Sequence, residues 1–288
     1  FFINPTTGHV LICDNDNVAP DRTNLGIVGK SGYMAPEIVD KESMPNRYTD
    51  YFSLAVILFI LFYLNRPFEG VRVAKCPCLT EEAEKKFFGK TAVFIMDPND
   101  DSNRPVRGLH TNIIRRWALF PKVLRETFIK AFSHDAIVAP TKRILDKTWM
   151  QVLLQVRSQY VPCPYCGEST FIDNIDSCKN KCVLCGESFE RPAVLKCGNF
   201  RIPLLKDQIL YACQTQSSTD VDLNKRIGVV VEHPTTRKLG IKNLSSNMWQ
   251  VKTSMGEIKN IEPNMGLPTT NDINVRFNKD ITGLIIKI

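Results

Sequence analysis

Two closely spaced pairs of cysteines constrain the fold of this 288-residue chain more than any other sequence feature. Cys163 and Cys166 form one C-x2-C pair, Cys182 and Cys185 form a second, and fifteen residues lie between the pairs. Two residues between thiolates allow a tight turn to bring both sulfurs within about 2.3 Å of one metal ion. The glycine after each pair permits a left-handed turn. The spacing therefore predicts a zinc ribbon over residues 158–191.

Four thiolates complete the tetrahedral coordination of Zn²⁺, so we expect a structural metal and not a catalytic one. Two alternatives stay open: reduced thiols without a metal, and Cys178 as a rival ligand four residues before Cys182. The other cysteines form no second pair of this spacing: Cys13, Cys76, Cys78, Cys197 and Cys213. A segment this short has little apolar core, so metal binding would supply about 10 kcal/mol of folding free energy.

Hydrophobic spacing divides the rest of the chain into two regions. Residues 1–157 are expected to be mainly helical after a short hairpin, in which FFI and HVLI flank a polar turn. The expected helices are 50–64, 80–88, 111–117, 121–132 and 141–156. Residues 192–288 contain short apolar runs between turn signals, which indicates an all-β sandwich or barrel. The predicted fold class is multidomain: a mainly α region, a small four-cysteine zinc ribbon and an all-β sandwich.

The most apolar segment, LAVILFILFYL at 54–64, is too short to span a membrane. As a helix it would be about 16 Å long, whereas the hydrocarbon core of a bilayer is about 30 Å thick. The first ten residues also lack the basic start and apolar run of a signal peptide. Since the thiol pattern suits a metal better than disulfides, we expect a cytoplasmic protein that does not bind membranes.

The net charge of +7 is concentrated in one part of the chain. Residues 101–160 contain eleven Lys and Arg against four Asp and Glu. A basic surface of this kind can bind nucleic acid, but aromatic residues do not alternate regularly with the charges. Solvated helix faces are therefore the favoured interpretation, and a zinc-ribbon protein that binds nucleic acid is kept as the third alternative.

Four strings in the first 157 residues occur in an order that is typical of one enzyme family. They are HVLICDND with Asp14, GKSGYMAPE with Glu37, DYFSLA beginning at Asp50, and Arg143 before the last predicted helix. Taken together, they resemble the C-terminal lobe of a eukaryotic-type Ser/Thr protein kinase. Asp14-Asn15-Asp16 is similar to the family's D-F-G motif, and Ala35-Pro36-Glu37 is similar to its A-P-E motif.

The resemblance implies roles for individual residues. Asp14 would bind Mg²⁺ that bridges the phosphates of ATP. The segment from Asp14 to Glu37 would be the activation segment, with Thr23 and Ser31 as its hydroxyls available for phosphorylation. Glu37 would form a buried ion pair with Arg143 and so anchor that segment. A protein substrate would receive the γ-phosphate on Ser or Thr.

The departures from the family pattern bear on activity. Asn15 and Asp16 replace the phenylalanine and glycine of D-F-G, and Lys30 replaces a threonine that orients the catalytic aspartate. The sequence contains no counterpart of the catalytic loop, of the glycine-rich loop or of its strand lysine. We therefore expect a fragment of a longer kinase-like parent that is inactive alone, or, as the alternative, a pseudokinase scaffold.

Two further resemblances concern partners. The connection over residues 71–116 resembles an insertion in bacterial kinase-like proteins that occur beside metal-dependent phosphatases, which implies a bacterial parent and a cognate phosphatase. The strings GVVVEH, LGIKNLSSN and MWQVKT resemble a forkhead-associated domain, with Asn247 as the loop asparagine. Met248 and Trp249 replace the expected Gly-Thr, and Arg201 is only a candidate for binding phosphate. A docking or autoregulatory sandwich is therefore favoured over phosphothreonine binding.

Overall fold

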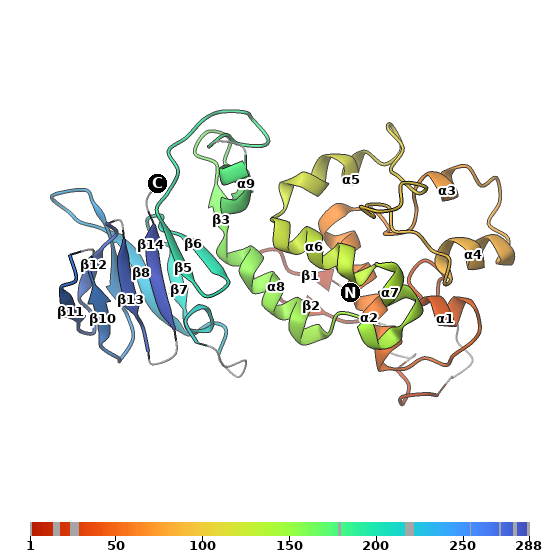
Figure 1. Ribbon diagram of the computed structural model, residues 1–288, viewed down its shortest axis with the longest axis horizontal. Helices are drawn as coiled ribbons and strands as arrows, with labels where there is room; N and C mark the ends of the chain where they lie inside the picture. Colours follow the sequence, from red (N-terminus) through yellow and green to blue (C-terminus); the bar gives the residue numbers. More distant parts are fainter. Residues whose placement is uncertain are drawn as a thin grey trace. The chain divides into compact units, whose positions relative to one another are not determined.

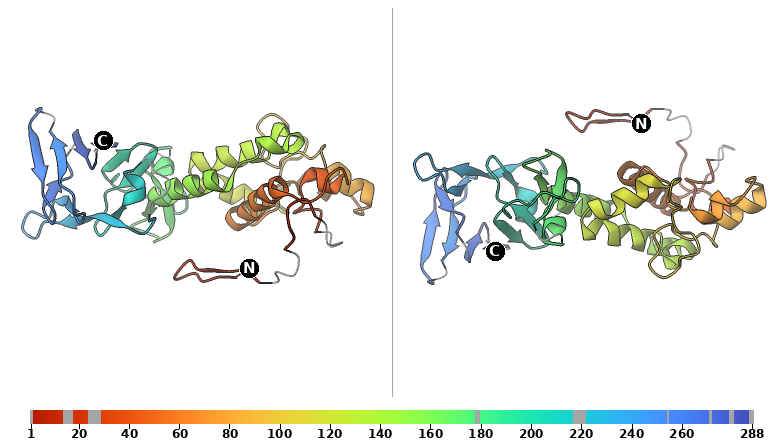
Figure 2. Two further views of the ribbon diagram at one scale, coloured as in Figure 1. Left: turned by 90° about the horizontal axis from the view of Figure 1, so that it is seen from below. Right: turned by 90° about the horizontal axis from the view of Figure 1, so that it is seen from above.

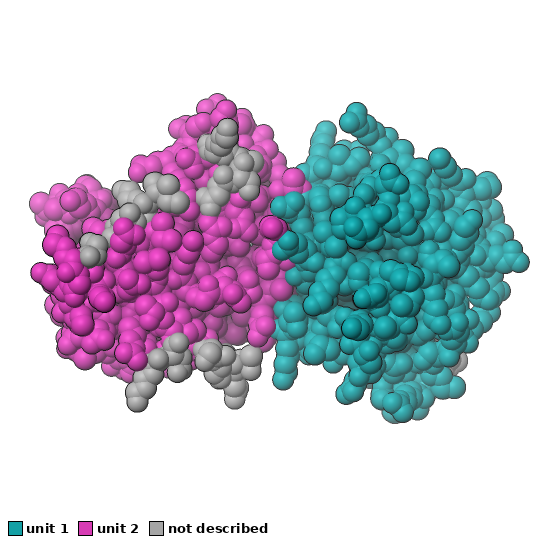
Figure 3. Space-filling view, in the orientation of Figure 1, with its two compact units in different colours: residues 1–117, 125–149 teal, residues 118–124, 150–288 magenta. Residues whose placement is uncertain are grey.

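The computed structural model of the protein describes residues 2–13, 18–23, 29–177, 180–216, 222–253, 255–270, 272–278 and 281–286. The chain divides into two compact units, which are coloured separately in Figure 3. One unit consists of Phe1–Trp117 with Arg125–Trp149, and the other of Ala118–Leu124 with Met150–Ile288. The first is mainly helical and the second is mainly β, with the ribbon and the sandwich in the same unit. The division into three domains stays a prediction.

The helical unit is built from short helices around one long one (Figure 1). Its helices are α1 (Pro36–Val39), α2 (Arg47–Tyr63), α3 (Val71–Ala74), α4 (Glu81–Phe88), α5 (Thr111–Arg116), most of α6 (Lys122–Ala131), α7 (His134–Val138) and the start of α8 (Asp146–Ser158). Two 3-10 turns, Trp117–Leu119 and Pro140–Lys142, adjoin α5 and α7.

Helix α2 lies at the centre of this unit because its sequence is apolar on nearly every side. Phe59, which is fully buried, packs its ring 4.9 Å from that of Tyr63, 5.4 Å from Phe94 and 5.2 Å from Phe128, measured between ring centroids. Edge-to-face aromatic packing at these separations adds to the free energy of apolar burial. The apolar run at 54–64 is thus part of a core helix, as its length predicts.

Both ends of α2 are fixed by local hydrogen bonds. The Asn46 side chain accepts from the backbone N–H of Tyr48 and Thr49, while Thr49 Oγ1 accepts from the backbone N–H of Asn46. This reciprocal arrangement satisfies backbone donors that the first turn of a helix leaves without partners. At the other end, Leu64 takes a left-handed conformation with φ 52° and donates its N–H to the carbonyl of Ile60.

The predicted helices correspond to those of the structure, with two shifted starts. The central helix begins at Arg47 and not at residue 50. The last helix begins at Asp146 and not at residue 141. Residues 140–142 form a 3-10 turn instead, and Arg143 is extended, with φ −67° and ψ 150°. That backbone directs the Arg143 side chain into the interior, where it binds Glu37. Helices α1, α3 and α7 were not predicted, because they are only four or five residues long.

The predicted N-terminal hairpin is present as β1 (Phe2–Ile3) and β2 (Val10–Leu11). Phe2 pairs with Leu11, and the connecting turn is held by Asn4 Oδ1, which accepts from the N–H of Thr6 and Thr7. The hairpin stands clear of the helices of its unit in both views of Figure 2. Its apolar side chains are accordingly exposed, by 70% for Phe2 and 63% for Leu11.

The second unit contains a sandwich of two antiparallel sheets. The six-stranded sheet has the order β11 (Ile258–Ile261), β10 (Trp249–Lys252), β13 (Ile273–Arg276), β14 (Thr282–Ile286), β5 (Val194–Cys197) and β6 (Phe200–Pro203). The four-stranded sheet has the order β12 (Gly266–Pro268), β9 (Leu239–Asn243), β8 (Arg226–Glu232) and β7 (Ile209–Tyr211). An all-β region beyond residue 192 was predicted; strands β5 and β12 were not.

Trp249 fills the centre of the sandwich core, and two glycines make room near it. The Trp249 ring is 1% exposed and lies 5.0 Å from that of Phe277. A Cβ added at Gly228 would come within 3.0 Å of the Trp249 ring, and one at Gly283 would come within 2.9 Å of Phe277. These glycines are therefore required by close packing between the sheets and not by turn geometry.

No helix in the described residues is long and apolar enough to cross a bilayer.

Replacement of Phe59 by alanine should lower the free energy of unfolding of the helical unit by about 3–5 kcal/mol, because it leaves a cavity amid several aromatic rings. Leu61→Ala is the matched control, since Leu61 lies on the same helix and is 46% exposed. Native-state hydrogen exchange of the α2 amides measures both. Equal loss of protection in the two variants would show that the core is not centred on Phe59.

Candidate functional site

The four predicted metal ligands lie on two turns of the second unit that have the same hydrogen bonds. The first turn joins β3 (Tyr160–Pro162) to β4 (Ser169–Phe171). In it, the N–H of Cys163 donates to the carbonyl of Glu168 at 2.9 Å, and the N–H of Gly167 donates to the carbonyl of Cys163 at 2.9 Å.

The second turn repeats this pattern further along the chain. Cys182 donates to the carbonyl of Glu187 at 2.9 Å, and Gly186 donates to the carbonyl of Cys182 at 3.0 Å. Gly167 has φ +73° and Gly186 has φ +78°, so both glycines take the left-handed conformation that the sequence predicts. In the second turn the N–H of Leu184 also points at Cys182 Sγ, at 3.4 Å.

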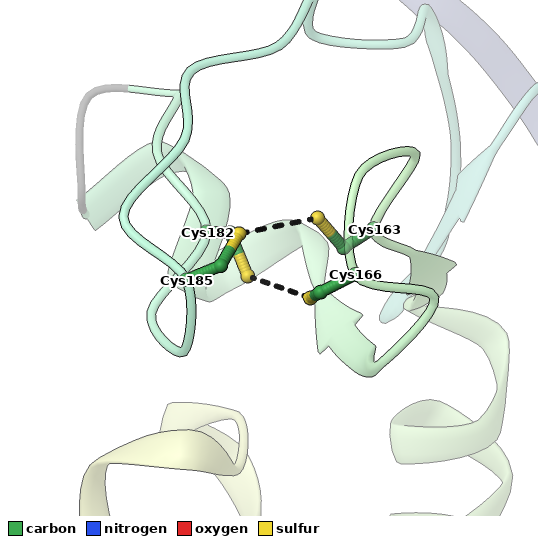
Figure 4. Close-up of side chains that lie close together, drawn as sticks. All are labelled: Cys163, Cys166, Cys182 and Cys185. Carbon is green, nitrogen blue, oxygen red and sulfur yellow. Dashed lines mark hydrogen bonds between the residues drawn. The ribbon is translucent and has the colours of Figure 1, made fainter.

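The four sulfurs form a compact cluster whose dimensions suit a tetrahedral metal ion (Figure 4). All four lie within 4.8 Å of one another, with Cys163 Sγ 3.8 Å from Cys185 Sγ and Cys166 Sγ 3.9 Å from Cys182 Sγ. Zn–S bonds of about 2.3 Å at tetrahedral angles place the sulfurs about 3.8 Å apart. A disulfide would require about 2.05 Å. The cluster can therefore hold a metal ion, and its ligand set is compatible with structural zinc.

The backbone around Cys163 favours the form of the thiol that binds metal. A backbone hydrogen bond from Cys166 outweighs burial and, with a further bond from Tyr165, lowers the pKa of the Cys163 thiol to about 7. In the metal-free cluster a backbone bond from Glu168 is outweighed by burial and the neighbouring sulfurs, which raise the pKa of the Cys166 thiol to about 12. A lowered pKa increases the fraction of thiolate near neutral pH, and thiolate is the metal-binding form. Among the described residues this is also the one group of cysteines, histidines and carboxylates close enough to share an ion.

The rival ligand Cys178 lies outside the described residues. The remaining cysteines of the described part are free thiols, and the pKa values of two of them are raised. Burial raises the pKa of the Cys197 thiol to about 12, and burial likewise raises the pKa of the Cys213 thiol. Cys76 Sγ lies 3.1 Å from the carbonyl of Cys78, within one short turn.

The ribbon is joined to the sandwich through a small apolar core. Helix α9 (Ile172–Ser177), which lies between the two cysteine turns, buries Ile172 and Ile175 against Val161 of β3 and Val194 of β5. The side chain of Asn174 donates to the carbonyls of Ala118 and Leu119, at 3.0 and 2.5 Å. The two cysteine turns are therefore attached to an apolar core that includes Val194 of strand β5.

Arg201, the candidate for phosphate binding, has a structural contact. It lies on β6 and its guanidinium pairs with the carboxylate of Asp173 on α9. The two side chains are only 27% and 20% exposed. Arg201 thus links the sandwich to the ribbon, and this geometry does not favour a role in binding phosphate.

In the helical unit the structure brings Glu37 and Arg143 together. Arg143 Nη1 donates to Glu37 Oε1 at 2.8 Å, and Arg143 Nη2 donates to Glu37 Oε2 at 2.6 Å. The side chain of Arg143 is 2% exposed and that of Glu37 is 8% exposed. The same guanidinium donates to the carbonyls of Tyr48 and Ala136, and it lies 5.2 Å from the centroid of the Phe52 ring. Such a planar, bidentate pair with further acceptors is the arrangement that a buried arginine needs.

The other residues of the proposed activation segment are not brought together. Asp14, Asn15 and Asp16 lie outside the described residues. Thr23 is exposed and its hydroxyl donates to the carbonyl of Pro20 at 2.7 Å. Lys30 is exposed.

Ser31 is half-buried, and its hydroxyl donates to Glu84 Oε1 at 2.9 Å. Phosphorylation of Ser31 would therefore place a phosphate against a carboxylate.

Asp50 lies in the first turn of α2, where its charge faces the positive end of the helix. The residue is exposed overall. Partial burial of its carboxylate raises its pKa, and the nearby negative charge of Asp21 raises it further. Asp50 is thus the fourth residue of α2, which begins at Arg47.

In the sandwich, sequence reasoning singled out Asn247 but missed Asn243. Asn247 is exposed, whereas Asn243 is fully buried and holds the loop between β9 and β10. Its amide donates to the carbonyls of Asn247 and Ile261, and its Oδ1 accepts from the N–H and hydroxyl of Ser245. The short spacing Asn-x-Ser after an apolar strand could have indicated such a side-chain turn.

In comparisons with known proteins, no family model and no curated sequence matches this chain.

The purified chain should contain one zinc ion, which inductively coupled plasma mass spectrometry would measure. Cys182→Ser should abolish binding, because removal of one thiolate leaves a buried position of the tetrahedron without its ligand. Cys78→Ser is the control, since Cys78 is an exposed free thiol outside the cluster. Full zinc content in the Cys182 variant, or none in the parent chain, would rule out the site.

Glu37→Gln should lower the free energy of unfolding of the helical unit by about 3–5 kcal/mol, because it leaves the Arg143 charge buried without its carboxylate. The double variant Glu37→Leu with Arg143→Met should recover most of this loss, since apolar replacement of a buried pair is often neutral. Urea denaturation measures both. Glu42→Gln, which breaks the exposed pair with Lys90, should leave the free energy of unfolding nearly unchanged.

A double variant as unstable as Glu37→Gln would show that the loss comes from disturbed packing and not from the unpaired charge.

Proposed function

We propose that the helical unit is the C-terminal lobe of a Ser/Thr protein kinase-like signalling protein. The observation that carries the proposal is the buried pair of Glu37 and Arg143, which are 106 residues apart in the chain. The family resemblance links these two residues because its A-P-E glutamate binds an arginine before the last helix. A bidentate pair between them supports the proposed position of the activation segment.

A second contact supports the same arrangement. Ser53 Oγ, on the apolar helix that follows Asp50, donates to the carbonyl of Tyr33 at 2.9 Å. Tyr33 belongs to the GKSGYMAPE string, which the resemblance makes the substrate-positioning loop. This hydrogen bond therefore connects the central helix to the proposed substrate-positioning loop. A loop that positions a protein substrate would need such a fixed contact.

The reaction proposed for the longer protein is transfer of the γ-phosphate of ATP to a Ser or Thr hydroxyl of a protein. In it, Asp14 would bind Mg²⁺ and the general base would come from a catalytic loop that this sequence does not contain. Positioning of ATP dominates phosphoryl-transfer catalysis. Without a counterpart of the glycine-rich loop, we expect this chain by itself to be inactive.

A scaffold function is the second candidate, and one structural observation favours it. The cysteine cluster has four protein ligands and no open position, and the ribbon that carries it shares apolar core residues with the sandwich. A closed metal site of this kind stabilises a binding module and does not perform chemistry. The changes at Asn15, Asp16 and Lys30 agree with a pseudokinase that assembles signalling partners, including a cognate phosphatase.

Labelling from γ-phosphate-labelled Mg·ATP distinguishes the two functions. The longer protein that carries this chain together with a catalytic loop should label itself or a general protein substrate. Asp14→Asn should reduce labelling by at least about a hundredfold, because the metal that neutralises the phosphates loses a ligand. Asp16→Asn is the matched control, two residues away with the same change in charge, and should retain most activity.

Absence of labelling with both Mg²⁺ and Mn²⁺, in a protein shown to be folded, would remove the kinase function and leave the scaffold. Equal labelling by wild type and Asp14→Asn would show that Asp14 is not the metal ligand.

A further inference from the structure

The six-stranded sheet has an outward face whose composition follows from its register. Lys252 of β10 pairs with Asn274 of β13, Asn274 pairs with Leu284 of β14, and Leu284 pairs with Lys196 of β5. Residues opposite one another in a ladder lie on the same face of the sheet. Lys252 and Lys196 therefore share one face, and both are exposed.

Arg276 lies on this face in the next row. It pairs with Gln250 on β10 and with Thr282 on β14, and all three side chains are exposed. The residues between these positions, such as Val251 and Val275, are buried in the core. We call the surface formed by Lys196, Lys252 and Arg276, with the amides and hydroxyl between them, the basic face.

On strands β10, β13, β14 and β5, no described residue of the basic face has a carboxylate side chain. The other members of its two rows, on these strands and on β11, are Ile258, Asn260, Gln250, Asn274, Leu284 and Thr282. Lys196, Lys252 and Arg276 form no ion pair within the described part of the chain; Arg276 Nε donates to the carbonyl of Asn278 at 3.2 Å. Lys252 and Arg276 are diagonal neighbours on β10 and β13, so their positive charges lie close together on the exposed face.

The outward face of the other sheet shows that this pattern is not general to the sandwich. There Ile209 pairs with Val229, and Val229 pairs with Lys242, so that apolar residues predominate. At the β6 side of the six-stranded sheet the one further cation, Arg201, is paired with Asp173 among the described residues. The basic face thus carries three cations without carboxylate partners among the described residues. On the other sheet Arg226 and Lys242 also lack such partners, but their cross-strand neighbours are Tyr211 and Val229 and not further polar side chains.

The spacing of the cations suits an extended polyanion. Lys252 and Lys196 are separated by three strand spacings, roughly 14 Å, and Arg276 lies about 7 Å along from their row. A single phosphate or carboxylate cannot contact cations so far apart. Lysine, arginine, asparagine, glutamine and threonine are the side chains that contact the phosphates of nucleic acids.

We propose that the basic face binds the phosphate backbone of double-stranded nucleic acid without reading its sequence. No aromatic side chain lies on the face in the described residues, and stacking on aromatics is what favours single strands. A broad sheet face inserts neither a helix nor a two-stranded β-ribbon into the major groove, so base edges are not read. The proposal concerns the sandwich and does not rest on the proposed kinase function.

Fluorescence anisotropy of the intact chain with a fluorescein-labelled DNA duplex of about 20 base pairs, titrated at several salt concentrations, tests the proposal. Three phosphate contacts contribute about 2.7 to the slope of log affinity against log salt. The variant Lys196→Gln, Lys252→Gln, Arg276→Gln should lose about that much slope and about tenfold or more in affinity at low salt. Its free energy of unfolding in urea should be close to that of wild type, because the three side chains are exposed and form no ion pair among the described residues.

The control carries Lys206→Gln, Lys225→Gln and Lys238→Gln, which remove the same charge from exposed positions outside the basic face. This control variant should keep nearly all of the wild-type slope of log affinity against log salt concentration. Equal loss in the two variants would show that net charge alone attracts DNA and would overturn the proposal. So would absence of binding at about 20 mM salt, tighter binding to single strands than to duplex, or binding of the face to anionic lipid vesicles in preference to DNA.

Discussion

The buried charge of Arg143 is the interaction on which the helical unit depends most. Removal of a cation from water costs several kcal/mol unless its donors and charge are fully matched. Here the match comes from Glu37 in α1, from the carbonyl of Tyr48 in the first turn of α2, and from the carbonyl of Ala136 in α7. One side chain therefore determines how these three segments lie, although α1 and α7 are each too short to be stable as isolated helices.

The second unit depends in a similar way on a few side chains that join its parts. The ribbon has only a handful of buried apolar residues, and two of its neighbours, Val194 and Leu205, belong to the sandwich. The metal cluster and this shared core therefore stabilise the same folded segment. Loss of the metal should accordingly affect the strand that begins at Val194 as well as the cysteine turns.

The sequence predicted those parts of the fold that rest on periodicity or on fixed spacing. The cysteine turns, the buried helix α2 and most strands from β6 onward follow from such patterns. The misses have particular causes. Helices α1, α3 and α7 span about one turn and have no period to detect. Strand β12 contains Pro268, which discourages a strand prediction but is tolerated because β12 is the edge of its sheet.

The site residues show the same limit. Spacing alone was sufficient to find the four cysteines, since all the ligands lie within 23 residues of one another. The partner of Glu37 lies 106 residues away and was found only through a family resemblance. The ion pair of Arg201 with Asp173 was not foreseen, because no local pattern relates a strand of the sandwich to the helix of the ribbon. The basic face likewise follows only from strand register, which a sequence does not fix.

The two glycines of the cysteine turns have a consequence that concerns handedness. A Cβ added at Gly167 or Gly186 would meet no atom within 4 Å, so space does not exclude a side chain there. What disfavours it is the positive φ, which costs an L-amino acid free energy and suits its mirror image. A D-alanine at either position would thus adopt this backbone without the strain that an L-alanine would carry. A D-alanine would also restrict the backbone conformations of the unfolded chain. The cysteine turn would then be closer to its metal-binding conformation before the ion binds.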